Sequence, residues 1–180
     1  PYMINIDTCN DALPKEQKDL GLKIRQSNLC SEITLPTDEE RTAVCCLSSV
    51  NLEHFDTWAK DDNFIEDLIT MLDNVIQHYI DNAIDTTQLG EYSANFKRFQ
   101  KYVREGKEGY TKSAYSAYRE RSLGLGAMGF HAYLQANNIP FEGIYATGFN
   151  HRAFTLIKAR AKEATKELAS QRGEAPDIHG

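Results

Sequence analysis

The chain has 180 residues, of which 41% are hydrophobic and 26% charged, a balance typical of a folded globular protein. Its formal net charge is -6, and an acidic chain is repelled by phosphates, which argues against binding to a nucleic-acid polymer. A single nucleotide is still possible, because small-ligand sites depend on local groups. No apolar run approaches the roughly 20 residues that span a bilayer, and the N-terminus lacks a signal-peptide pattern. We therefore expect a cytoplasmic protein with no membrane partner.

The four cysteines are too few for a small secreted disulfide scaffold and favour a reducing compartment: Cys9, Cys30, Cys45 and Cys46. The chain does not begin with Met, and residues 175–180 contain no recognisable terminal element. We therefore expect both ends to be cuts through a longer protein.

The first third of the chain has the patterns of strands and loops. Residues 2–7 alternate large apolar and other side chains, which predicts a strand. Residues 11–21 are polar and contain Pro14, which predicts a loop. Residues 24–35 have no helical period, and residues 42–52 form a second β-like run of small and β-branched residues.

Helical periodicity begins at Phe64 and continues for more than five turns after the capping residues 61–63. A weaker helix is predicted around 92–103, ending at Gly106, and a short one over 110–118. Two more follow, one around 130–134 that ends before Pro140, and one over 153–168 that ends at Gly173. The sequence therefore predicts an α/β fold with strands first, a helix-rich second half and an incomplete sheet.

A cluster of reactive side chains lies at Asn28, Cys30 and Glu32. On an extended backbone these alternate residues project to one face, which then carries an amide, a thiol and a carboxylate. A lone cysteine is usually a buried small hydrophobe. Burying this trio without a ligand would cost several kcal/mol of desolvation, so the cluster predicts a polar, hydroxylated substrate and hydrogen-transfer or redox chemistry.

Four segments carry a resemblance to a known family. Residues 26–33, Gln-Ser-Asn-Leu-Cys-Ser-Glu-Ile, are similar to the finger loop of the ribonucleotide reductase large subunit. Residues 1–10 resemble the barrel strand before that loop, residues 45–52 the strand after it, and residues 121–130 a later strand-to-helix segment. The likeness is collinear over most of the chain, and residues 92–118 look longer than the usual connection.

The resemblance implies a set of site residues. Cys30 would become a thiyl radical and abstract the 3′ hydrogen of a ribonucleotide. Glu32 would act as the general base for the 3′-hydroxyl, and Asn28 would hydrogen-bond the substrate hydroxyls. Leu29 and Ser31 would complete the substrate-binding run, with no metal ligands. Cys45 would be one half of the dithiol that supplies the reducing equivalents.

The strand pattern independently separates Cys45 from Cys46, because successive side chains of a strand point to opposite faces. The even positions form a mostly apolar set suited to packing: Val44, Cys46, Ser48, Val50 and Leu52. The odd positions form a smaller, more polar set suited to a barrel interior: Ala43, Cys45, Leu47, Ser49 and Asn51. We therefore expect Cys45 to share the interior with Cys30.

The resemblance also implies an architecture and partners. Residues 1–180 would be a single piece of a ten-stranded α/β barrel, with the finger loop at about 25–35 and the helical part at about 62–172. The Asn-Leu-Cys form of the loop favours class I. Such an enzyme makes deoxyribonucleotides for DNA replication, and the isolated chain would be inactive without the remaining segments of the subunit.

A class I enzyme implies no cofactor in this chain, because the radical comes from a separate small, metal-containing subunit. Thioredoxin or glutaredoxin would be the reductant, and the large subunit would be a homodimer. The nucleotide effectors of this allosteric enzyme would bind outside this piece.

Two other functions remain open at the level of sequence. Residues 124–129 match G-x-G-x-x-G, which could belong to a nicotinamide-dependent oxidoreductase, although residues 118–122 before it do not look like a buried strand. A non-enzymatic module that docks through the helix from Phe64 is the second alternative. The aromatic residues and interleaved basic residues of 92–101 are more typical of a packed face than of an RNA contact. Scattered histidines and adjacent Cys45 and Cys46 argue against a zinc site.

Overall fold

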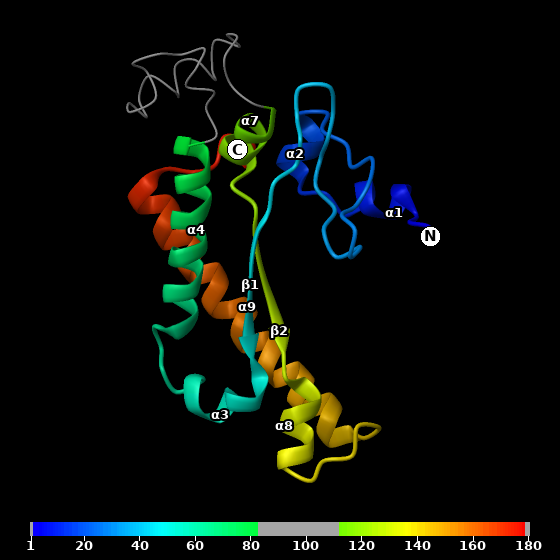
Figure 1. The fold of residues 1–180 in the computed structure, drawn as a ribbon, viewed down its shortest axis with the longest axis vertical. Coiled ribbons are helices and arrows are strands. Elements are labelled where there is room, and N and C mark those ends of the chain that lie inside the picture. Colours follow the sequence, from blue (N-terminus) through cyan, green and yellow to red (C-terminus); the bar gives the residue numbers. More distant parts are fainter. Residues whose placement is uncertain (1, 83–111, 179–180) are drawn as a thin grey trace. The chain divides into compact units, whose positions relative to one another are not determined.

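The computed structural model describes residues 2–82 and 112–178, which divide into two compact units (Figure 1). Unit 1 comprises Pro1–Cys45, Val75–Ser122 and Glu174–Gly180, and unit 2 comprises Cys46–Asn74 and Leu123–Gly173. The described elements, in chain order, are α1 (Ile6–Asp11), α2 (Lys15–Asp19), β1 (Cys46–Asn51), η1 (Leu52–His54), α3 (Phe55–Trp58), α4 (Phe64–Asn82), α7 (Lys112–Glu120), β2 (Leu123–Met128), α8 (Phe130–Ala136) and α9 (Ile144–Arg172). The fold is therefore a mixture of helix and strand, as predicted.

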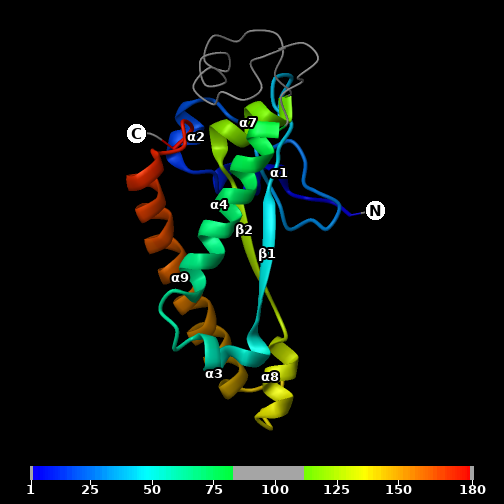
Figure 2. The same cartoon turned by 60° about the vertical axis from the view of Figure 1, so that its left-hand side comes forward.

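Unit 2 is built around a parallel pair of strands. β1 pairs with β2 from Cys46 opposite Leu123 to Asn51 opposite Met128, and the two strands run side by side in both ribbon views (Figures 1 and 2). On β1 the even positions are the more buried ones, with Val50 only 1% exposed, whereas Leu47 and Ser49 are exposed. The alternation predicted for this run is confirmed, and its regular part begins at Cys46.

An aromatic cluster forms the core beside these strands. The rings of Tyr133 and Phe149 stack with centroids 3.7 Å apart, and Phe55 meets the edge of Phe149 at 5.3 Å. Trp58 packs edge-on against Phe55 at 5.0 Å and donates its indole N–H to the Asn51 carbonyl oxygen at 2.9 Å. Such aromatic contacts add to the hydrophobic stabilisation and fix ring geometry. They join the turn after β1 to helices α8 and α9.

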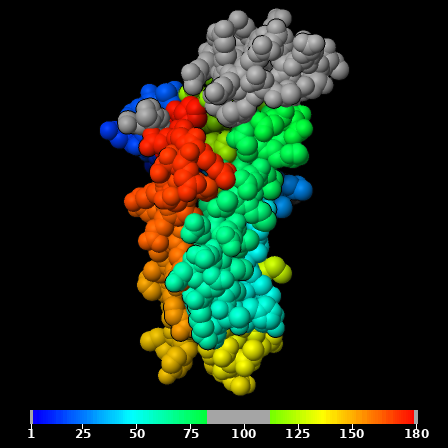
Figure 3. Space-filling model, turned by 90° about the vertical axis from the view of Figure 1, so that its left-hand side faces the viewer, coloured from blue at the N-terminus to red at the C-terminus, as the bar shows by residue number. Residues whose placement is uncertain are grey.

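The two long helices confirm the periodicity seen in the sequence. The Asp61 carboxylate accepts a hydrogen bond from the Asn63 backbone N–H just before α4, and α9 ends at Gly173 with φ of +91°. In unit 2, residues 64–74 of α4 and helix α9 pack side by side (Figure 3), and Arg172 pairs with Asp73 at 2.5 Å. The apolar face of α4 lies in the protein's own core, with Ile65, Leu72, Ile76 and Ile80 at most 2% exposed. The interpretation of this pattern as a docking face for another protein is therefore wrong.

Four other predictions need correction or lie outside the described residues. The strand predicted for residues 2–7 is wrong, because the Asn5 side chain accepts a hydrogen bond from the Thr8 N–H and starts α1 instead. The loop predicted for residues 11–21 contains the short helix α2. Strand β2 lies within the part expected to be helical, 62–172. The helix predicted around 92–103 lies outside the described residues. That residues 1–180 form a single piece of one barrel domain stays a prediction.

The glycine motif at 124–129 has the wrong geometry for a dinucleotide site. Gly124 and Gly126 lie inside β2, opposite Leu47 and Ser49, instead of forming the turn after the strand. A phosphate-binding fingerprint places its glycines in that turn. Only Gly129 lies at the strand-to-helix junction, with φ of +75°. The nicotinamide-dependent alternative therefore loses its sequence support.

We predict that Gly129→Ala destabilises unit 2, whereas Gly148→Ala stabilises it. A Cβ at Gly129 would lie 2.1 Å from Asn51 Oδ1 on a backbone with positive φ, which should cost about 2 kcal/mol or more. Gly148 lies inside α9 with open space around its Cβ position, so alanine should add about 0.5–1 kcal/mol. Urea denaturation of the two variants measures both changes, and equal effects would contradict the role assigned to Gly129.

Candidate active site on the finger loop

The finger loop is closed at its base by contacts within unit 1. Ile24 and Pro36 form an antiparallel bridge, and the Thr37 N–H donates to the Lys23 carbonyl oxygen at 3.1 Å. Asn10, from α1, holds the same base. Its amide donates to the Ile24 carbonyl oxygen at 2.9 Å, and its Oδ1 accepts from the Ile24 N–H at 2.8 Å. Helix α1 therefore anchors the loop at residue 24.

The tip of the loop is a turn, and the extended backbone expected there is wrong. The Ser31 N–H donates to the Asn28 carbonyl oxygen at 3.1 Å, and Ser31 has φ of +67°. The Asn28 N–H donates to the Ile33 carbonyl oxygen at 3.3 Å, while Asn28 Oδ1 accepts from the Ile33 N–H at 3.1 Å. Asn28 closes the turn with both its backbone and its side chain, which is a common role for asparagine.

The turn brings Asn28 and Glu32 together. Asn28 Nδ2 donates to Glu32 Oε1 at 2.6 Å, a short bond of the kind expected when the acceptor is an ionised carboxylate. Cys30 and Glu32 are exposed and Leu29 is 92% exposed, so the trio carries no large desolvation cost in this chain. The amide and the carboxylate flank the exposed thiol on either side of the turn. Asn28 thus orients the Glu32 carboxylate on the same turn that exposes the Cys30 thiol.

Two side chains outside the predicted site support the loop. The Tyr2 hydroxyl lies 2.8 Å from both the Asn28 carbonyl oxygen and Ser27 Oγ. Neither Tyr2 nor Asn10 stands out by a sequence pattern, because each reaches a residue at least 14 positions away. Their roles depend on tertiary contacts that periodicity does not report.

The adjacent thiols Cys45 and Cys46 occupy different places in the chain. Cys45 is half-buried and ends unit 1, immediately before β1. Cys46 is the first residue of β1, on the same side as buried Val50, and burial raises the pKa of its thiol. Cys45 and Cys46 are both half-buried, and their separate roles stay predictions.

A buried ion cluster was not predicted from the sequence. Arg41 pairs with Asp177 and lies 3.3 Å from Glu120, while Arg119 pairs with Asp177 at 2.6 Å. Burial raises the pKa of Glu120, and the positive charge of Arg41 opposes that rise. Asp177 is fully buried, although residues 175–178 contain no helix or strand, as the sequence predicted. Arg41 follows the acidic run 38–40, which in sequence looks like a solvated surface segment.

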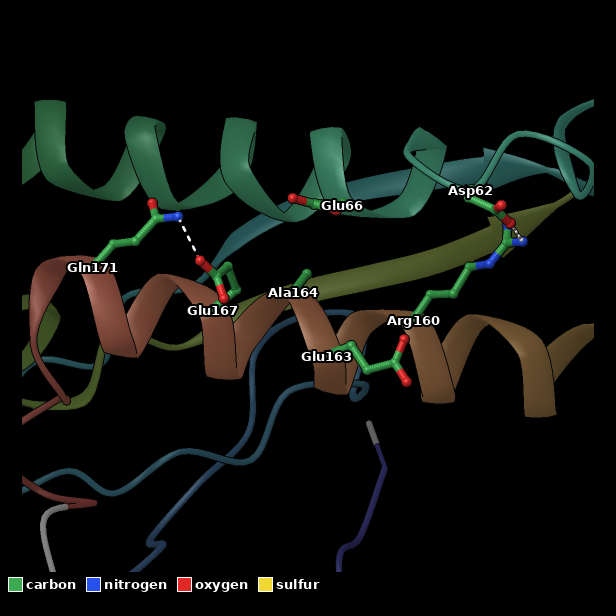
Figure 4. A pocket seen from close by; sticks show the side chains of 7 residues that line it. All are labelled: Asp62, Glu66, Arg160, Glu163, Ala164, Glu167 and Gln171. Atoms are coloured by element: carbon green, nitrogen blue, oxygen red, sulfur yellow. Dashed lines mark hydrogen bonds and ion pairs between the residues drawn. The ribbon is translucent and has the colours of Figure 1, made fainter.

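One further pocket lies in unit 2 between α4 and α9 (Figure 4). Its lining is mainly acidic: Asp62, Glu66, Arg160, Glu163, Ala164, Glu167 and Gln171. Arg160 pairs with Asp62 at 2.6 Å and Gln171 donates to Glu167 at 2.8 Å.

Across residues 2–82 and 112–178, no group of three or more His, Cys, Asp or Glu side chains is placed to hold a metal ion. None of the described helices is long and apolar enough to cross a membrane.

An exposed thiol on a loop, together with a fold of mixed helix and strand, is compatible with a redox enzyme, and comparison with known proteins identifies the family. Residues 1–180 match the family described as "Ribonucleotide reductase, barrel domain". The chain belongs to the ribonucleotide reductase family.

Individual relatives agree with this assignment. The chain is 44% identical over its whole length to the ribonucleoside-diphosphate reductase large subunit of Invertebrate iridescent virus 3, of which it covers 25%. It is 47% identical to a putative large subunit of Frog virus 3, of which it covers 28%. The solved structure of an Actinobacillus ureae class Id ribonucleotide reductase alpha subunit superposes with a TM-score of 0.79 at 33% identity, over 99% of this chain and 30% of that one. The chain thus spans about a quarter of the length of these curated relatives.

We predict that iodoacetamide modifies Cys30 at least about tenfold faster than Cys46 in the folded chain at neutral pH. Cys30 is exposed, whereas Cys46 is half-buried and its raised pKa leaves a smaller thiolate fraction. Mass spectrometry of timed samples gives both rates. In urea the two rates should converge. Equal rates in the folded chain would show that β1 does not protect Cys46.

Proposed function

We propose that this chain supplies the catalytic loop of a class I ribonucleotide reductase large subunit, which reduces ribonucleoside diphosphates to deoxyribonucleotides. The observation that carries the proposal is the Asn28–Glu32 hydrogen bond across the turn that presents Cys30. The bond joins the proposed base to the proposed amide donor on the turn that exposes the Cys30 thiol. Membership of the ribonucleotide reductase family supports this proposal.

In this proposal Cys30 carries the radical. A Cys30 thiyl radical takes the 3′ hydrogen atom of the ribose and becomes a thiol, leaving the unpaired electron on the 3′ carbon. Glu32 accepts the 3′-hydroxyl proton. Its Oε1 is held by Asn28, so Oε2 is the oxygen that faces this task. A positioned general base contributes roughly 10²–10⁴-fold in rate.

Asn28 has two tasks in the same step. Its Oδ1 stabilises the turn through the Ile33 N–H, and its amide orients Glu32. When a ribonucleotide enters, the amide also donates to the substrate hydroxyls. Leu29 and Ser31 form the rest of the substrate-binding run at the tip. The turn itself is therefore a binding element, because its shape depends on the same asparagine that meets the substrate.

Cys45 is proposed as one half of the reducing dithiol. Two thiols each give up a proton and an electron as they join in a disulfide. The two electrons and two protons reduce the 2′ position, and the 2′-hydroxyl leaves as water. Thioredoxin or glutaredoxin then restores the dithiol. The second cysteine would come from the remaining segments of the large subunit.

The proposal extends to the whole assembly. We propose a ten-stranded α/β barrel around the finger loop, to which the parallel pair β1 and β2 would contribute neighbouring strands. The radical would come from a small metal-containing subunit, and the large subunit would form a homodimer with its effector sites outside these residues. A cytoplasmic location follows from the reductants that the reaction uses.

Variants of the loop tip test the radical and base roles in the whole subunit. Cys30→Ser should abolish deoxyribonucleotide formation and leave nucleotide binding intact, because oxygen preserves the size but forms no usable radical. Glu32→Gln should bind similarly and react about 10²-fold or more slowly, since an amide cannot accept the proton. Turnover assays paired with equilibrium nucleotide binding measure both. Normal turnover by the serine variant would refute the proposal.

The adjacent cysteines provide a matched pair for the redox role. Cys45→Ser should block multiple turnover driven by the dithiol, whereas Cys46→Ala should lower stability by about 1 kcal/mol and leave the chemistry running. Product yield with thioredoxin or glutaredoxin present, together with urea unfolding, separates the two effects. A redox defect in the Cys46 variant would show that the assignment of faces is shifted by one residue.

A further inference from the structure

Three segments that are distant in sequence meet at the buried ion cluster of unit 1. Arg41 belongs to the segment that leads to Cys45, Arg119 and Glu120 belong to α7, and Asp177 belongs to the segment that follows α9. The side chains of Arg41, Glu120 and Asp177 are 5%, 1% and 0% exposed. The cluster therefore joins all three segments through contacts that water does not screen.

The cluster is balanced in charge and satisfied in hydrogen bonding. It contains two guanidinium groups and two carboxylates, so its formal charges cancel. Asp177 uses Oδ2 for Arg41 and Oδ1 for Arg119, whose Nε lies at 2.7 Å. Ser116 and Ser122 hydroxyls donate to Glu120 at 3.3 and 3.4 Å. Removal of one member leaves an uncompensated buried charge, which is far more costly than the loss of a surface ion pair.

The cluster also holds the chain segment that leads to Cys45. The Thr42 N–H donates to the Lys112 carbonyl oxygen at 3.3 Å, and the Asp177 N–H donates to the Arg119 carbonyl oxygen at 3.0 Å. Regular strand structure begins only at Cys46, so Cys45 lies between an anchor at residues 41–42 and the start of β1. No secondary-structure ladder holds residues 42–45 among the described residues. The Arg41 anchor therefore constrains this segment from its N-terminal side.

We propose that Asp177 and Arg41 are positioning residues for the redox thiol of Cys45. Together they hold the segment from Arg41 to Cys45 so that the sulfur stays where it can give up its hydrogen and form the disulfide. The inference rests on the proposed function of Cys45. Asp177 itself touches neither substrate nor sulfur in this role and acts through Arg41.

The test uses the complete large subunit with its radical-generating partner. In Asp177→Asn, the alkylation rate of Cys45 relative to Cys30 in the same molecule should rise about threefold or more, because the segment is loosened. Product formed by the prereduced enzyme without external reductant should fall about tenfold, since small displacements of reacting groups carry large rate penalties. The KM for the nucleotide should stay within about twofold, because no member of the cluster belongs to the substrate-binding run.

Asp73→Asn is the matched control, because Asp73 is also a buried carboxylate paired with an arginine, but in unit 2. It should lower stability without changing the Cys45-to-Cys30 ratio by more than about twofold. If Asp177→Asn fails to fold, Arg41→Lys supplies the test. Nη1 of Arg41 contacts both carboxylates, and the shorter lysine side chain keeps the charge but not the position of that nitrogen. It should give an intermediate change in the same ratio.

A folded Asp177→Asn or Arg41→Lys variant with an unchanged ratio and an unchanged product yield would overturn the inference. An equally large change in the ratio with Asp73→Asn would also overturn it, because general loosening would then explain the result. Failure of the proposed function looks different. In that case Cys45→Ser itself would keep full turnover, while the alkylation ratio would still report whether the cluster positions the thiol.

Discussion

The parallel pairing of β1 with β2 is the constraint on which the architecture of unit 2 depends. Parallel strands need a long crossover, and here more than 70 residues separate Asn51 from Leu123. Every backbone group on the paired edges is satisfied only if residues 46–51 and 123–128 meet in one register. That register places Val50 in the core and puts Gly129 against Asn51, so the turns after both strands pack together.

The finger loop depends on a different principle, the use of asparagine side chains in place of backbone partners. Asn10 satisfies both polar groups of Ile24 at the base, and Asn28 satisfies Ile33 and Glu32 at the tip. A loop of this length without strand pairing needs such side-chain bonds to hold one shape. The residues that give the loop its shape at the tip are the same ones proposed to act on substrate. In the proposed function, substrate binding and loop stability therefore both depend on Asn28.

The buried ion cluster shows how a polar network can join segments that periodicity does not connect. Its members come from residues 41, 119, 120 and 177, and each is unremarkable in its local sequence. Buried charges are retained where they are fully paired, and here the pairing joins the approach to Cys45 to the last described residues. The charges of the cluster balance only when all four members are present, so the loss of any one leaves an unpaired buried charge.

The sequence by itself determined the elements whose signal is local. The apolar period from Phe64 predicted α4, Gly173 predicted the end of α9, and the alternation of residues 46–50 predicted the buried face of β1. The Asn-Leu-Cys-Ser-Glu run likewise indicated the family and the candidate site. Only the tertiary structure decided that Asn5 starts a helix at the N-terminus, that the tip of the loop turns at Ser31, and that Asp177 is buried beside Arg41. The physical reason is that each of these outcomes depends on a hydrogen bond or ion pair, often between residues far apart in the chain, whereas periodicity reports only which face of a segment avoids water.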